Sequence, residues 1–263
     1  MTERYAVIGH PVGHSRSPDI HARFAQATGQ DIEYGRIEAP LDAFERTVDE
    51  FRAAGGRGLN VTLPFKQAAF RYCSELAERA REAQVVNTLL FGPRVLGDNT
   101  DGVGLVRDIE VNLAVSLGGK TVLLMGAGGA AQAVAGALFA ARVGRLVIAN
   151  RTFSKAQALA ARVKATATRD DDLREPFDVV VNATSAGLGA EPAAFPAAAI
   201  GKNTLAYDMV YGRETAFLRA ASARGARCAD GLGMLVEQAA ESFFLWRGVR
   251  PPTRSVLASL RGR

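Results

Sequence analysis

The fold is decided by the stretch Thr121-Val-Leu-Leu-Met125-Gly126-Ala-Gly128-Gly-Ala-Ala131. Its first five residues form a short apolar run, typical of a strand buried on both faces. The turn that follows matches the G-x-G-x-x-A dinucleotide fingerprint, and an alanine-rich helical pattern from Ala130 to Arg142 comes next. The first glycine permits a tight turn, the second lets the backbone approach a pyrophosphate, and a small residue at the last position allows close helix packing. The stretch therefore predicts a Rossmann-type, doubly wound parallel sheet, with the phosphates cradled by Gly126, Ala127, Gly128, Gly129, Ala130 and Ala131.

The end of the next predicted strand indicates which dinucleotide binds. An NAD site usually places Asp or Glu about 20 residues further on, where the carboxylate holds the ribose hydroxyls. Here the sequence reads Asn150-Arg151-Thr152, with Lys155 shortly after, and contains no acid. A guanidinium can stack on adenine and pair with a 2′-phosphate, which a carboxylate would repel. The sequence therefore favours NADP over NAD as the cofactor.

Short apolar runs alternate with helical patterns on both sides of this motif, so the predicted fold class is α/β. We expect two α/β domains with an interdomain cleft: residues 1–101 for substrate binding and catalysis, and residues 102–235 as the NADP-binding, Rossmann-like domain. The C-terminal helices within residues 236–263 should pack back onto the first domain. The predicted strands cover 5–9, 32–37, 58–62, 121–125, 146–149, 178–181 and 205–210, and the helices 18–28, 41–54, 64–73, 100–112, 130–142, 154–163, 233–246 and 253–260.

Composition limits the class of protein. The chain has 263 residues, 48% of them hydrophobic, and can bury a sizeable core. Its formal charge is +5, but the positive residues are interleaved with acidic ones. Only 7% of all residues are aromatic. Both features argue against nucleic-acid binding. The two cysteines, Cys73 and Cys228, form neither a disulfide framework nor a metal-ligand pattern, so a reducing cytoplasm is the expected location.

Three other features of the sequence bear on metal binding, membrane insertion and export. Pro11 and Gly13 break any helical spacing between His10 and His14, so we expect no metal site. The uncharged stretch 121–141 is long enough to span a membrane, but its glycines and alanines suit a buried strand and helix better. No apolar leader follows Met1, so no export is expected.

Lys66 is the only lysine in the first 119 residues, where twelve arginines carry the other side-chain positive charges. Arginine stays protonated, whereas lysine can give up and regain a proton. In Asn60-Val-Thr-Leu-Pro-Phe-Lys66, Pro64 should start a helix directly after a strand, which places Lys66 on the first turn. Lys66 is therefore a candidate proton donor, although a solvated surface lysine is the commoner role of this residue type.

Several polar residues upstream of the fingerprint lie in turns bounded by glycine or proline. Each of them alone suits a helix cap or a turn, and Ser17 before Pro18 is a predicted N-cap. Together they suit a small molecule rich in hydroxyl groups. These residues are Ser15, Ser17, Asn60, Thr62, Asn87 and Asp101.

The ordered motifs of the chain resemble those of the shikimate dehydrogenase family. They run from Val7-Ile-Gly-His-Pro11 to Asp230-Gly-Leu-Gly-Met-Leu-Val-Glu-Gln-Ala239, and include Asn182-Ala-Thr-Ser-Ala-Gly187 and Tyr207-Asp-Met-Val-Tyr211. They therefore cover nearly the whole sequence. The resemblance implies an oxidoreductase that reversibly reduces 3-dehydroshikimate to shikimate with NADPH, in the pathway to chorismate and the aromatic amino acids.

The resemblance also implies roles for individual residues. Lys66 and Asp101 would form the catalytic pair, and Ser15, Ser17 and Tyr211 would hold the substrate carboxylate. Asn60, Thr62, Asn87, Asp101 and Gln238 would bind the ring hydroxyls. Residues 126–131 would cradle the pyrophosphate, Asn150, Arg151, Thr152 and Lys155 would bind the 2′-phosphate, and Thr184, Met209 and Gly231 would line the rest of the cofactor cleft.

Two departures from the family pattern concern the cofactor site and the placement of Tyr211, and two other functions are kept as alternatives. Lys155 stands where many members carry arginine, which keeps the charge but loses the bidentate geometry. The run after Tyr211 is shorter than the family pattern and lacks its usual Thr-Pro. The alternatives are a quinate/shikimate dehydrogenase that uses NAD and a non-catalytic, NADP-binding regulatory relative. We expect no nucleic-acid or membrane partner, and the oligomeric state is open, with a homodimer as one option.

Overall fold

The computed structural model describes residues 2–184 and 197–262. The chain divides into two compact units, residues 1–104 with 235–263 and residues 105–234. The chain passes from the first unit to the second within α5 (Asp101–Arg107) and returns within α9 (Leu232–Arg247). None of the helices in the described part of the chain has the length and apolar character needed to cross a bilayer.

The first unit is built on a six-stranded mixed sheet with the strand order β2-β1-β3-β5-β6-β4. The strands β1, β2 and β3 run parallel, while β5 pairs antiparallel with both β3 and β6. The strands are β1 (Glu3–Gly9), β2 (Ile32–Glu38), β3 (Gly56–Val61), β4 (Glu75–Leu76), β5 (Thr88–Phe91) and β6 (Val95–Asp98). The helices are α1 (Ser17–Thr28), α2 (Phe44–Ala53), α3 (Lys66–Tyr72), α4 (Glu78–Ala83), α9 and α10 (Thr253–Arg261).

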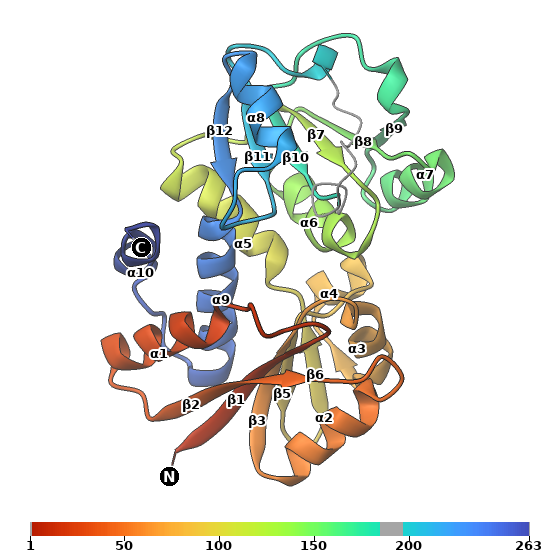
Figure 1. Ribbon diagram of the computed structural model, residues 1–263. Coiled ribbons are helices and arrows are strands. Elements are labelled where there is room, and N and C mark those ends of the chain that lie inside the picture. Colours follow the sequence, from red (N-terminus) through yellow and green to blue (C-terminus); the bar gives the residue numbers. More distant parts are fainter. Residues whose placement is uncertain (1, 185–196, 263) are drawn as a thin grey trace. The chain divides into compact units, whose positions relative to one another are not determined.

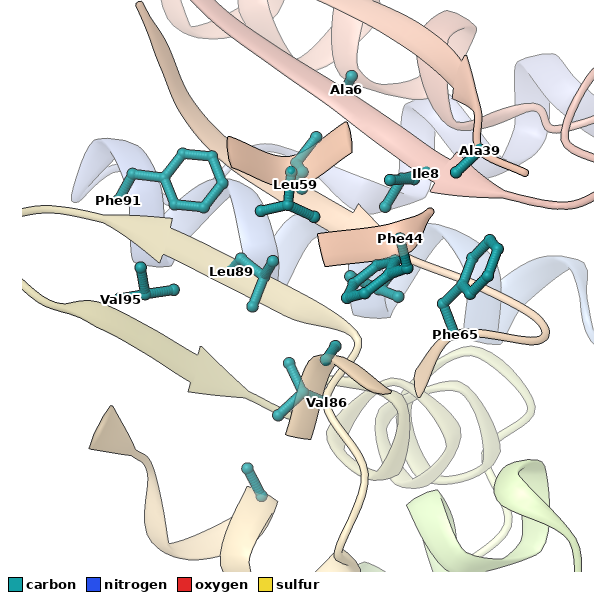
Figure 2. Packing of buried hydrophobic residues seen from close by; sticks show 14 residues of the cluster. Ala6, Ile8, Ala39, Phe44, Leu59, Phe65, Val86, Leu89, Phe91 and Val95 are labelled. Atoms are coloured by element: carbon teal, nitrogen blue, oxygen red, sulfur yellow. The ribbon is translucent and has the colours of Figure 1, made fainter. Parts of the chain in front are cut away.

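Side chains alternate across this sheet, so each strand contributes to two layers. On one face, Ile8, Leu59 and Leu89 pack against Phe44 and Phe65, next to α2 and α3 (Figure 2). On the other face, Tyr5 of β1 stacks on Trp246 of α9 with ring centroids 4.6 Å apart. The C-terminal helices are thus part of the core of the first unit.

The second unit is a six-stranded, all-parallel sheet with the order β12-β11-β10-β7-β8-β9 (Figure 1). The strands β8 and β9 lie on one side of β7, and β10, β11 and β12 lie on the other side. The strand order therefore reverses between β7 and β10, which is the topological switch point of the sheet. The strands are β7 (Thr121–Met125), β8 (Arg145–Ala149), β9 (Thr166–Thr168), β10 (Val179–Asn182), β11 (Leu205–Asp208) and β12 (Arg227–Asp230), and the helices are α6 (Gly129–Ala140), α7 (Phe153–Arg162) and α8 (Ala216–Ala223). A π-helical turn, Asp108–Asn112, continues α5. Short 3₁₀ turns cover Asp170–Asp172 and Ala197–Ala199.

The predicted α/β class and the Rossmann-type sheet are confirmed. Two local predictions were wrong. The helix expected from Pro64 begins at Lys66, because residues 63–65 form a turn. Ser17 is the first residue of α1 and not its N-cap; the Oγ of Ser15 accepts the backbone N–H of Ser17 instead, at 3.3 Å. Of the Asn182–Gly187 motif, residues 185–187 lie outside the described residues.

Candidate active site and cofactor site

Lys66 and Asp101 form an ion pair in the first unit. Lys66 is the first residue of α3 and Asp101 the first of α5, and the Lys66 Nζ donates a hydrogen bond to the Asp101 Oδ2. The Lys66 side chain is 15% exposed and that of Asp101 is 8% exposed. The connections that follow β3 and β6 therefore bring these two residues together, and the pair is largely shielded from water.

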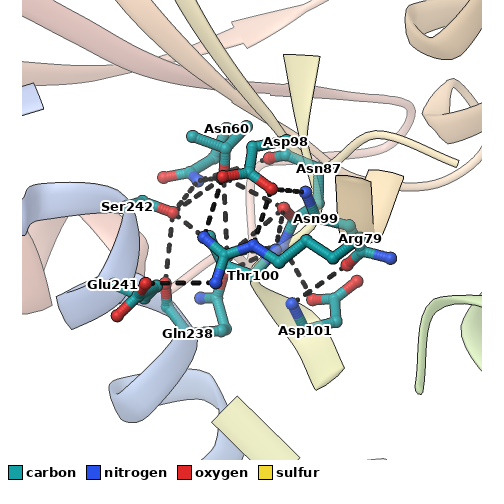
Figure 3. Close-up of polar contacts among 11 residues, drawn as sticks. Asn60, Arg79, Asn87, Asp98, Asn99, Thr100, Asp101, Gln238, Glu241 and Ser242 are labelled. Carbon is teal, nitrogen blue, oxygen red and sulfur yellow. Dashed lines mark hydrogen bonds and ion pairs between the residues drawn. The ribbon is translucent and has the colours of Figure 1, made fainter. Parts of the chain in front are cut away.

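Asn87 holds the other oxygen of Asp101. The backbone N–H of Thr100 donates to the Asn87 Oδ1 at 2.8 Å, which fixes the orientation of the side-chain amide because a backbone N–H can only donate. The Nδ2 of Asn87 then faces the Asp101 Oδ1 at 2.9 Å (Figure 3). Asp101 accepts from a lysine at one oxygen and from an amide at the other, so its carboxylate geometry is set from both sides.

Asn60 lies in the same polar cluster, at the end of β3. Its Nδ2 contacts Ser242 at 2.9 Å, the Thr88 hydroxyl at 3.2 Å and the Asn87 carbonyl at 3.3 Å. The Gln238 Oε1 accepts from the Asn87 Nδ2 at 3.3 Å, and the Gln238 Nε2 donates to the Leu235 carbonyl at 2.8 Å. The structure thus brings Asn60, Asn87, Asp101 and Gln238 into one hydrogen-bonded group with Lys66.

Ser15 and Thr62 lie in the connections that follow β1 and β3, and Ser17 is the first residue of α1. The two serine hydroxyls are 3.2 Å apart, and the Arg36 guanidinium holds the Ser15 carbonyl at 2.6 Å. The Thr62 N–H donates to the Ile8 carbonyl at 2.9 Å. A Cβ on Gly9 would lie 2.5 Å from the Thr62 Cγ2, so glycine is required where these two connections meet.

Sequence analysis missed several members of the polar cluster. Thr88, Thr100 and Ser242 are buried hydroxyl residues that bond to Asn60 or Asn87, and Tyr34 donates to the Asn60 Oδ1 at 2.7 Å. No motif marks these residues. Their only signal is a polar side chain at a position that the helix or strand pattern expects to be buried.

An ion-pair network around two shielded carboxylates, Asp98 and Glu241, supports the loop that carries Asp101. Arg79 of α4 makes two bonds to Asp98, at 2.6 and 2.8 Å, and contacts Glu241 of α9 at 3.1 Å (Figure 3). Arg250 bonds to the other oxygen of Glu241 at 2.8 Å. Burial alone would raise the pKa of Glu241, but Arg250 and Arg79 lower it below its ordinary value. The network therefore fixes the start of the loop at Asp98.

In the second unit, the glycine-rich turn lies at the switch point. Gly126 has φ +105°, and an added Cβ would lie 3.1 Å from the Ala183 carbonyl, so both the conformation and the space favour glycine. Open space surrounds the Cβ positions of Gly128 and Gly129. No described side chain caps the N-terminus of α6. These features fit a dinucleotide pyrophosphate, which needs backbone N–H groups and room for close approach.

The residues after β8 fit the adenosine end of NADP. Arg151, Thr152 and Lys155 are exposed at the start of α7, and the Asn150 Nδ2 donates to the Thr152 carbonyl at 2.9 Å. No acid stands in this turn. The turn therefore offers two cations and a hydroxyl to a 2′-phosphate.

The other predicted cofactor residues follow the carboxyl ends of neighbouring strands. Thr184 follows β10, and its Oγ1 donates to the Asn182 Oδ1 at 2.7 Å. A Cβ on Gly231 would lie 2.3 Å from the Met209 carbonyl, so these two residues are in backbone contact after β12 and β11. Tyr211 follows β11 as well, in the second unit.

Comparisons with known proteins identify relatives of the whole chain. The shikimate dehydrogenase substrate binding domain matches residues 7–89, shikimate / quinate 5-dehydrogenase matches residues 109–189, and the shikimate 5′-dehydrogenase C-terminal domain matches residues 231–261. Shikimate dehydrogenase (NADP(+)) of Methylobacillus flagellatus is 56% identical over 98% of this chain and 99% of its own length.

Solved structures agree with this result. The crystal structure of an Ael1 enzyme from Pseudomonas putida is 49% identical and covers 98% of each chain with a TM-score of 0.94. Shikimate 5-dehydrogenase from Thermus thermophilus, in complex with NADP(H) and shikimate, is 35% identical and covers 99% of each chain with a TM-score of 0.89.

Proposed function

This chain belongs to the shikimate dehydrogenase family, and we propose that it catalyses the NADPH-dependent, reversible reduction of 3-dehydroshikimate to shikimate. The activity is that of an NADP-dependent oxidoreductase acting on a CH–OH group, in the biosynthesis of chorismate and the aromatic amino acids. The observation that carries the proposal is the shielded Lys66–Asp101 pair within a cluster of hydroxyl-binding side chains.

Lys66 is the proposed proton donor. Reduction of a ketone adds a hydride to carbon and a proton to oxygen, and bound NADPH supplies the hydride. Negative charge develops on the ketone oxygen during this transfer, and a positioned ammonium stabilises that charge and then supplies the proton. Asp101 accepts a hydrogen bond from Lys66 and is proposed to accept a second from a substrate hydroxyl, which would fix the ammonium and the ketone relative to each other.

The remaining polar residues are proposed to bind the substrate. Ser15 and Ser17, with Tyr211, would hold the substrate carboxylate through hydroxyl groups. The ring hydroxyls would be bound by Asn60, Thr62, Asn87, Asp101 and Gln238. Support for this assignment comes from the direct bonds among Asn60, Asn87, Asp101 and Gln238. We assign substrate binding and catalysis to residues 1–101 with 236–263.

Residues 102–235 are proposed to bind NADP. The pyrophosphate would lie on residues 126–131, and the 2′-phosphate on Asn150, Arg151, Thr152 and Lys155. Thr184, Met209 and Gly231 would line the rest of the site, since all three follow the carboxyl ends of parallel strands, where such sheets bind ligands.

We place the enzyme in the cytoplasm, with small molecules rather than nucleic acid or a membrane as its partners. Both cysteines are free thiols, as expected in a reducing compartment. A homodimer is the proposed assembly, and sedimentation velocity tests it directly.

The activity is tested by following absorbance at the nicotinamide band. Shikimate and quinate are each offered with NADP and with NAD. Reduction of NADP by shikimate, with much slower reaction of the other three combinations, is the expected result. Faster reaction of quinate with NAD would favour the alternative enzyme. Binding of NADP without any turnover would indicate a non-catalytic relative.

A further inference from the structure

Tyr34 is a partly buried tyrosine whose ring and hydroxyl are both held. Its ring lies flat against the His21 ring, with centroids 4.1 Å apart and an interplanar angle of 5°. Its hydroxyl donates to the Asn60 Oδ1 at 2.7 Å. Burial holds the pKa of Tyr34 well above its ordinary value, so the hydroxyl keeps its proton. Tyr34 therefore acts as a fixed hydrogen-bond donor.

His21 provides the flat surface on which the Tyr34 ring lies. It is fully buried on α1, and neither of its ring nitrogens has a hydrogen-bond partner among the described residues. Phe24, Phe243 and Trp246 surround it, with ring centroids 5.5–6.1 Å away. Of these ring contacts, the stack on Tyr34 has the shortest distance between centroids.

The orientation of the Asn60 amide follows from its partners. A backbone carbonyl can only accept, so the contact with the Asn87 carbonyl identifies the nitrogen side of the Asn60 amide. The two Nδ2 hydrogens are shared among three protein acceptors, those of Ser242, Thr88 and Asn87. Among the bonds of the described residues, Tyr34 occupies one lone pair of the Oδ1. The remaining capacity of this amide is therefore the second lone pair of the Oδ1, which accepts hydrogen bonds.

The same contacts continue to the catalytic pair. The Asn60 Nδ2 faces the Thr88 Oγ1 at 3.2 Å, and the Thr88 hydroxyl donates to the Asn87 Oδ1 at 2.9 Å. Asn87 in turn donates to the Asp101 Oδ1 at 2.9 Å. A change in the Asn60 amide is thus linked to Asp101 through two intermediate residues.

We propose that Tyr34, stacked on His21, is a positioning residue that orients the Asn60 amide so that its Oδ1 accepts a hydrogen bond from a substrate hydroxyl. Tyr34 itself does not touch the substrate. A flipped Asn60 would present N–H groups where the hydroxyl donor lies and would leave the Asn87 carbonyl facing an oxygen. The inference rests on the proposed function, because the hydroxyl belongs to shikimate.

The first test is Tyr34→Phe, which removes the hydroxyl and keeps the ring. The dissociation constant of shikimate, measured by calorimetry, should rise about tenfold, the effect of losing one buried hydrogen bond. The affinity for NADP should not change. Tyr72→Phe is the matched control, because Tyr72 also donates one hydrogen bond at 2.6 Å, to Asp49 on the surface of the same unit. An unchanged shikimate affinity in Y34F overturns the inference.

A double-mutant cycle separates positioning from a general structural role. If Tyr34 acts through Asn60, adding Tyr34→Phe to Asn60→Ala should weaken shikimate binding no further than Asn60→Ala alone. Full additivity of the two effects on the dissociation constant contradicts the proposal. If urea unfolding shows that Y34F is not folded, His21→Ala takes its place: it removes the stack, leaves the hydroxyl, and should also weaken shikimate binding, whereas unchanged binding overturns the role of the stack.

Failure of the inference is distinguishable from failure of the proposed function. Wild-type enzyme that does not oxidise shikimate with NADP overturns the proposed function. Wild-type turnover combined with equal shikimate affinity in the wild type and Y34F overturns the positioning role alone.

Discussion

At the scale of single residues, Lys66 is the side chain on which the proposed proton transfer depends. Lys66→Ala should lower turnover of shikimate by about 10²–10⁴-fold, because it removes the proton donor and leaves hydride transfer in place. Binding of NADP should be retained. Lys120→Ala is a suitable control, since Lys120 forms a lysine–aspartate pair with Asp178 at 3.2 Å that is far more exposed. Steady-state rates for the two variants give the comparison, and unchanged turnover in K66A would refute the assignment.

His21 should make the protein sensitive to acid. Burial lowers the pKa of His21 from 6.5 to about 3. Between these pH values the unfolded chain binds a proton that the folded protein does not. The free energy of unfolding should therefore be unaffected by His21 above pH 6.5 and fall as the pH drops toward about 3. His21 should lower the free energy of unfolding by at most about 1.4 kcal/mol for each pH unit. His21→Phe keeps an aromatic ring and should remove this part of the slope. Urea unfolding at several pH values measures it, and parallel curves for the two proteins would contradict the prediction.

At the scale of elements, the turn between β7 and α6 is specified by backbone conformation. Gly126→Ala should destabilise the protein by about 1–3 kcal/mol, because alanine is strained at positive φ. It should also weaken NADP binding more than tenfold, since the Cβ approaches the Ala183 carbonyl and shifts the turn.

Gly119→Ala is the control for this variant. Gly119 has φ +75°, and an added Cβ meets nothing within 4 Å. It should lose similar stability and keep its affinity for NADP. Equal loss of NADP affinity in both variants would show that backbone strain alone, and not the phosphate turn, is responsible.

Elements with a strong local signal could be predicted from the sequence. The strand at residues 121–125 has the predicted bounds because its four apolar residues, Val122 to Met125, are all buried. The hairpin of β5 and β6 was missed, although Leu89-Leu90-Phe91 and Val95-Leu96 flank a Gly-Pro turn.

Lys66 could be found because its residue type is unusual in its part of the chain. Ser242 and Tyr34 could not, because their closeness to Asn60 depends on how β2, β3 and α9 pack together.

At the scale of the whole molecule, each of the two units has its own cluster of buried hydrophobic residues among the described residues. Trp246 is the only tryptophan and belongs to the first unit, whereas NADP is proposed to bind the second. A ligand present at about 100 times its dissociation constant stabilises the part that binds it by about 2.7 kcal/mol. Saturating shikimate should therefore raise the urea midpoint seen by tryptophan fluorescence.

Saturating NADP is the matched condition. It should raise the midpoint seen by circular dichroism, which reports on both units, and leave the tryptophan transition in place. Equal shifts of both signals with NADP would mean that the two units unfold as one cooperative structure.

The fixed direction of the bonds from Tyr34 to Asp101 has one more consequence, which concerns how Lys66, the proposed proton donor, regains its proton. Two of the links are carboxamides, Asn60 and Asn87, and carboxamides neither take up nor release protons at neutral pH. This route through Asn60 and Asn87 therefore does not conduct protons toward Asp101. If Lys66 is the proton donor, as proposed, it should regain the proton after each reduction through the exposed 15% of its side chain, from water or buffer.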